Sequence, residues 1–94
     1  MINMQTIVDN AIDANLQVYK KEARHYYTLK RIADTSKTKK DIRDFSNMAS
    51  SSLNIFSTIE DTLIRLFPDF DEYITERLVR ARLEVKTDKT VSRL

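Results

Sequence analysis

Nine basic side chains between residues 20 and 43 are the groups in this chain best suited to bind a charged ligand. Ammonium and guanidinium groups form strong hydrogen bonds with phosphate and carboxylate oxygens. Only three acids share this segment, so its local charge is strongly positive although the net charge of the whole chain is +2. We predict that this segment binds an anionic partner, through Lys20, Lys21, Arg24, Tyr27, Lys30, Arg31, Lys37, Lys39, Lys40 and Arg43. The alternative is that these cations are only solvated.

Four of these cations crowd the start of an expected helix at residue 39: Lys37, Lys39, Lys40 and Arg43. A helix N-terminus is already electropositive, so cations are locally unfavourable there. A functional cause would explain this arrangement, because free backbone amides together with cations can hold an anion. The anion could be an acidic protein surface, or the phosphate of a nucleic acid or nucleotide.

Groups that could catalyse a reaction lack partners in the sequence. His25 is the only histidine, and Glu22 is the only carboxylate near it at helical spacing. Ser50, Ser51 and Ser52 fall in the middle of an expected helix without a base beside them, where small side chains favour close helix approach. The chain also has no glycine, which a phosphate-cradling loop needs. We therefore expect a protein that is not an enzyme.

Acidic side chains gather in the second half of the chain, at Glu60, Asp61, Asp69, Asp71, Glu72 and Glu76. Glu72 and Glu76 share a helix face, but neither a glycine-turned loop nor a second set of ligands accompanies them. Acids are also favoured at the start of a helix. We expect no metal ion and no cofactor.

The composition predicts an all-α fold. Glycine and proline supply most turns, and the chain has no glycine and one proline. Apolar residues recur at helical spacing in three segments, so we expect helices at about 5–33, 39–67 and 69–85, followed by a polar, loose tail at 86–94. Thr38 would cap the second helix, and Pro68 would end it.

Two long helices of similar length joined by a short link predict an antiparallel hairpin. The first helix is apolar on two faces near its start, and the second widens its apolar face near its end. These two regions meet at the open end of the hairpin, so the shorter third helix should pack there. We expect a single helical domain over residues 1–94, with a basic hairpin turn and an acidic open end.

Two long helices and one short one leave apolar surface uncovered near the basic half. The expected exposed members are Leu29, Ile32, Phe45 and Met48. A second copy could cover them, and antiparallel pairing would also place the basic turn of one copy beside the acidic end of the other. We therefore expect a homo-oligomer, with a dimer favoured.

These features together predict a small, non-enzymatic helical interaction or regulatory module that binds another macromolecule, of the kind that phages and mobile elements often encode. The expected partner is a protein, and a phosphate-binding module for nucleic acid or an anionic nucleotide is the alternative. Cysteine is absent, and no signal peptide or membrane-spanning segment is evident. We expect a cytoplasmic protein that does not bind membranes.

Overall fold

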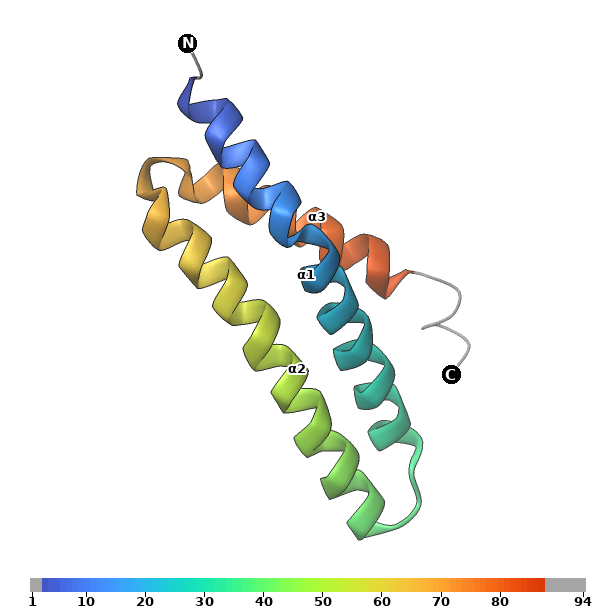
Figure 1. The fold of residues 1–94 in the computed structure, drawn as a ribbon. Coiled ribbons are helices and arrows are strands. Elements are labelled where there is room, and N and C mark those ends of the chain that lie inside the picture. Colours follow the sequence, from blue (N-terminus) through green and yellow to red (C-terminus); the bar gives the residue numbers. More distant parts are fainter. Residues whose placement is uncertain (1–2, 88–94) are drawn as a thin grey trace.

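A computed structural model describes residues 3–87 of the 94-residue chain, and these form three α-helices and a short 3-10 helix (Figure 1). The elements are α1 (Met4–Thr35), α2 (Lys39–Leu66), η1 (Pro68–Phe70) and α3 (Asp71–Lys86). The predicted all-α hairpin with a shorter third helix is confirmed, and each helix boundary lies within two residues of its predicted position. Most of the predicted tail, residues 88–94, lies outside the described residues.

Short polar side chains set the helix boundaries. Asn3 caps α1 by accepting a hydrogen bond of 2.8 Å from the backbone N–H of Thr6. Thr38 caps α2 as predicted, because its hydroxyl accepts a hydrogen bond of 3.2 Å from the backbone N–H of Asp41. Pro68 follows α2 and begins η1. No described residue has a positive φ angle, so a chain without glycine can form both connections.

The molecule is elongated, with principal extents of 57 × 24 × 18 Å. Helices α1 and α2 run antiparallel along most of their length, and α3 turns back from the open end (Figure 1). α3 packs mainly on α1. Tyr73 near the start of α3 bonds to Asp9, and Glu84 near its end pairs with Lys20 at 3.3 Å, so α3 advances in the same sense as α1.

The hydrophobic core lies where the three helices meet. Its largest fully buried side chains are Tyr19, Phe56, Ile12, Ile74, Leu78 and Val8. The rings of Tyr19 and Phe56 pack edge to face with centroids 5.6 Å apart. Beyond α3, towards the hairpin turn, the buried residues are small: Ala33, Ala49 and Ser52. The thin half of the molecule is therefore a two-helix hairpin held by small side chains.

Candidate functional site

The helix connection at residues 36–38 gathers six of the ten predicted binding residues at one end of the molecule. We call them the basic tip: Lys30, Arg31, Lys37, Lys39, Lys40 and Arg43. They come from the last turns of α1, the connection and the first turns of α2, and all six side chains are exposed. Figure 1 shows that this end of the hairpin projects away from α3.

Some cations of α1 and α3 are ion-paired, whereas the basic tip contains no ion pair within the described residues. Among the described residues, none of the six tip cations forms an ion pair with a carboxylate. Lys30 lies over the ring of Tyr26, with 5.6 Å from its Nζ to the ring centroid. In contrast, Arg77 on α3 lies 3.1 Å from a carboxylate oxygen of both Asp9 and Asp13. The exposed acids Asp34, Asp41 and Asp44 lie in the same segment, so the tip keeps a smaller net positive charge without a direct ion pair in the described part of the chain.

The start of α2 also presents free backbone donors. The Thr38 hydroxyl accepts a hydrogen bond from the backbone N–H of Asp41, and the Thr38 carbonyl accepts one of 3.1 Å from the backbone N–H of Ile42. The N–H groups of Lys39 and Lys40 have no acceptor in the described part of the chain. The predicted combination of free amides and cations is present at this helix start.

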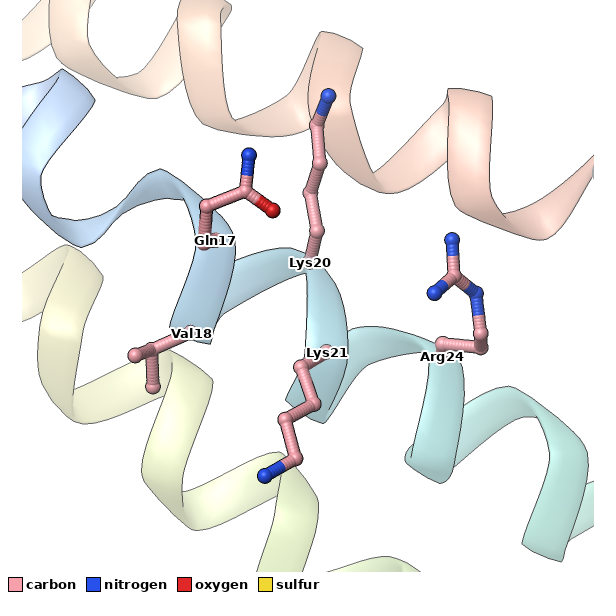
Figure 2. A pocket seen from close by; sticks show the side chains of 5 residues that line it. All are labelled: Gln17, Val18, Lys20, Lys21 and Arg24. Carbon is pink, nitrogen blue, oxygen red and sulfur yellow. The ribbon is translucent and has the colours of Figure 1, made fainter.

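The other predicted cations lie in the middle of α1 and do not join the basic tip. Figure 2 shows a shallow hollow lined by Gln17, Val18, Lys20, Lys21 and Arg24, all from α1. Gln17, Lys20 and Arg24 point towards α3, whereas Val18 and Lys21 point to the other side of the helix (Figure 2). Lys20 pairs with Glu84 at 3.3 Å. This region therefore contributes to the contact between α1 and α3, and one helix alone cannot enclose a ligand.

Tyr27 also belongs to the contact between α1 and α3. Its ring lies edge-on to Tyr26, with centroids 5.1 Å apart, and Lys86 of α3 lies over it at 5.8 Å. The ring is half-buried. A base stacking on this ring would have to displace Lys86.

The residues considered for catalysis or metal binding remain dispersed. His25 lies 3.8 Å from Glu22, the neighbour expected from the sequence. The hydroxyls of Ser50 and Ser51 donate to the carbonyls of Ser46 and Asn47, while Ser52 is buried against α1. Among residues 3–87 no three potential metal ligands come together. The acids at the open end, Asp61, Asp69, Asp71 and Glu72, form no ion pair within the described residues.

A polar cluster around the buried Tyr19 hydroxyl was not predicted from the sequence. The hydroxyl of Tyr19 is buried without a hydrogen-bond partner in the described part of the chain. Burial raises the pKa of this phenol, and the nearby Glu60 carboxylate raises it further. Burial likewise raises the pKa of Glu60, against the attraction of Arg82 on α3. The sequence analysis considered Glu60 only as one of the acids in the second half of the chain, and α3 brings Arg82 close to it and to Tyr19.

One side of the hairpin carries most of the exposed apolar surface. Arg77 and Glu84 of α3 form ion pairs with Asp9, Asp13 and Lys20 on one flank of α1. The opposite flank of α1 presents Ala11 and Val18. We call this uncovered side the open face; its members are Met4, Ile7, Ala11, Ala14, Asn15 and Val18 of α1, with Met48, Ser51, Ile55, Thr58, Ile59, Thr62 and Leu66 of α2. It contains six of the eight exposed large hydrophobic residues.

The four residues predicted for self-association lie on or beside the tip-ward part of the open face. Met48 is 53% exposed, and Leu29, Ile32 and Phe45 are half-buried. The sequence analysis missed the larger part of the face, at Met4, Ile7, Val18, Ile55 and Leu66. The signal was present, because the first helix is apolar on two faces, but the sequence does not show which face α3 covers.

Comparison with known proteins found no matching family model, no similar curated protein and no similar solved structure. None of the described helices is both long enough and apolar enough to cross a lipid bilayer.

Proposed function

We propose that this protein is a non-enzymatic helical interaction module whose basic tip binds an acidic surface of another protein. The observation that carries the proposal is the set of six exposed tip cations, none of which forms an ion pair in the described part of the chain, while Lys20, Arg77 and Arg80 are paired. Unpaired charges of one sign attract a partner of opposite sign and accelerate its association.

Apolar side chains beside the cations favour a protein partner over a nucleic acid. Ile42 is 41% exposed, Met48 is 53% exposed, and Phe45 between them is half-buried. These side chains could pack against apolar residues of an acidic protein surface, whereas a phosphate backbone offers them little to contact. Tyr27, the one aromatic ring among the ten predicted binding residues, already contacts Lys86 and Tyr26.

The shape of the site favours binding over catalysis. The cations surround a projecting turn between two helices (Figure 1), and the hollow nearest to it is lined by one of them, Lys30. A convex site can fit into a groove of a partner, but it does not exclude water from a reacting group.

Binding to defined probes tests this function. The probes are a fluorescent peptide of alternating acidic and apolar residues, and a fluorescent oligothymidylate of equal charge. The variant Lys37→Glu/Lys40→Glu reverses two tip charges, and Arg65→Glu/Arg80→Glu makes the same change in charge at exposed positions away from the tip. We expect the tip variant to weaken peptide binding about tenfold or more, because it reverses two charges that contact the peptide. We expect the control to weaken binding less than about threefold, because exposed charges away from the contact contribute little.

A phosphate-binding module is the second candidate, favoured by the free N–H groups of Lys39 and Lys40 among the tip cations. In that case the oligothymidylate would bind more tightly than the peptide. Its affinity would also fall steeply with salt, because bound phosphates release counterions. Equal binding by the tip variant and the wild type would contradict both functions.

A further inference from the structure

The open face of the hairpin has a composition unlike that of a solvated helix surface. None of its thirteen members is charged, although 32% of the residues in the chain are charged. Residues 45–59 of α2 form an unbroken run without a single charged side chain. Depletion of charge together with exposed aliphatic residues is typical of surfaces that become covered by another protein.

The polar members of the open face can be covered at low cost. The side chain of Asn15 donates to the Ala11 carbonyl at 2.8 Å, and the hydroxyl of Thr58 donates to the Asn54 carbonyl at 2.7 Å. Ser51 similarly donates to the Asn47 carbonyl at 3.3 Å. The hydroxyl donors of Thr58 and Ser51 and one N–H of Asn15 are satisfied within their own helix, so removing water does not leave these donors unpaired.

We propose that the open face binds a second copy of this chain, packed antiparallel about a twofold axis near Val18 and Ile55. The two hairpins would form a four-helix core, and the two α3 helices would lie on its outer sides. This inference does not rest on the proposed function, although Met48 belongs to both surfaces and the dimer would place each basic tip near acids of the other copy.

The arrangement of charge favours a second copy over an unrelated partner. A twofold axis places each residue close to its own counterpart, so charged residues near the axis would repel one another. The residues of α2 around Ile55 are uncharged, and the charged residues of α1 nearest to Val18 on this side, Lys21 and Glu22, have opposite signs. At the two ends the charges are opposite, and antiparallel packing places each basic tip beside the unpaired acids of the other copy: Asp61, Asp69, Asp71 and Glu72.

The two ends of the open face are also complementary in apolar character. Val18 lies midway along α1, so rotation about this point brings Met4 and Ile7 of one copy towards Leu29 and Ile32 of the other. The open end and the tip-ward end therefore each supply exposed or half-buried apolar groups. The residues expected from the sequence to self-associate become one end of a longer interface.

The area of the open face suits a stable dimer. From Met4 to Ile32, α1 rises about 42 Å, and two adjacent helices are about 20 Å wide, which gives roughly 800 Å² for each copy. Stable protein interfaces bury about 800 Å² per partner. The uncharged half alone would provide only about half of this area, so the full length of the hairpin is required.

Mass in solution, measured by light scattering over a concentration series, tests the dimer. We expect the wild type to reach twice the chain mass of 11.0 kDa. Ile55→Lys should raise the dimer dissociation constant about 30-fold or more, because it places a charge at the centre of the interface. Val18→Glu, on α1, provides a second disruption, and Leu83→Lys is the matched control, because Leu83 is 55% exposed on α3. Helical circular dichroism verifies the folding of each variant.

A mixture of two variants tests whether the face binds its own copy. Ile55→Lys and Ile55→Glu should each be monomeric and should form a heterodimer when mixed, because the two new charges would then attract. A monomeric wild type at the highest concentration would overturn the proposal. A heterodimer that fails to form, or a dimer that Ile55→Lys weakens no more than Leu83→Lys does, would also overturn it, and would leave the assignment of the basic tip unaffected.

Discussion

Replacing Tyr19 by phenylalanine is expected to stabilise this protein, although the change removes a polar group from the centre of the fold. Tyr19 has 0% of its surface exposed, and its hydroxyl has no hydrogen-bond partner among the described residues. In the unfolded chain that hydroxyl is hydrated. Folding therefore removes its bonds to water without replacing them, and the substitution eliminates this cost.

The magnitude follows from what the substitution keeps and what it deletes. The ring keeps its edge-to-face contact with Phe56, whose centroid lies 5.6 Å away. An unsatisfied buried hydroxyl costs about 1–3 kcal/mol, and the small void left by the oxygen offsets part of the gain. We expect the free energy of unfolding to rise by about 1 kcal/mol, which corresponds to an increase in Tm of about 4–8 °C for a domain of this size.

Tyr73→Phe is the matched control, because it deletes the same atom from a site where the atom is bonded. The Tyr73 hydroxyl donates to a carboxylate oxygen of Asp9 and accepts from Arg77 at 3.5 Å. Its removal leaves the part-buried Asp9 with one donor fewer, so we expect a loss of about 1 kcal/mol. The two Tyr→Phe changes should therefore have opposite signs.

Urea denaturation followed by helical circular dichroism measures both variants with the same probe. The transition midpoint should shift at constant slope if only the stability changes. A Tyr19→Phe protein that is less stable than the wild type would refute the reasoning. That result would mean that the hydroxyl is bonded in solution, with Glu60 or an ordered water as the acceptor.

Two further predictions concern Glu60 and Leu78. Burial raises the pKa of the Glu60 carboxyl group, and Arg82 opposes the shift. The contribution of Glu60 to the free energy of unfolding is therefore fully present below the pKa that this group has in the unfolded chain. That contribution is lost as the pH rises through the higher pKa of the folded protein. Glu60→Gln should match the wild type in acid and exceed its stability at neutral pH, which denaturation at a series of pH values would measure; a variant that is less stable at neutral pH would contradict this. Leu78→Ala, at a fully buried position of α3, should lower the free energy of unfolding by about 3 kcal/mol, whereas Leu83→Ala, at a 55% exposed position, should change it by less than about 1 kcal/mol in the same urea titration.

The helices and their boundaries were predictable because they depend on local chemistry. Thr38 presents a hydroxyl to the start of α2, and Pro68 lacks the N–H that another helical turn would need. Apolar residues at three- and four-residue spacing determine which side of each long helix is buried against the other. The hairpin then follows from two helices of similar length with a short connection.

The basic tip was only partly predictable. Sequence proximity placed nine cations in one segment, but a helix distributes neighbouring residues around its axis. Lys20 therefore points to α3 and pairs with Glu84, while Lys37 and Lys40 remain unpaired at the turn within the described part of the chain. Tyr27 was expected to be available, and its contact with Lys86 depends on the path of α3.

The sequence by itself determined that α1 would be apolar on two flanks, but only the tertiary structure decided which flank is covered. Helix periodicity specifies the direction of each side chain around its own axis, and it does not specify where a third helix will pack. α3 packed on the flank where Arg77 reaches Asp9 and Asp13 and where Leu78 enters the core. The opposite flank, with Val18 and Ile55 about half exposed, remained uncovered because a 16-residue helix can cover only one side of the hairpin.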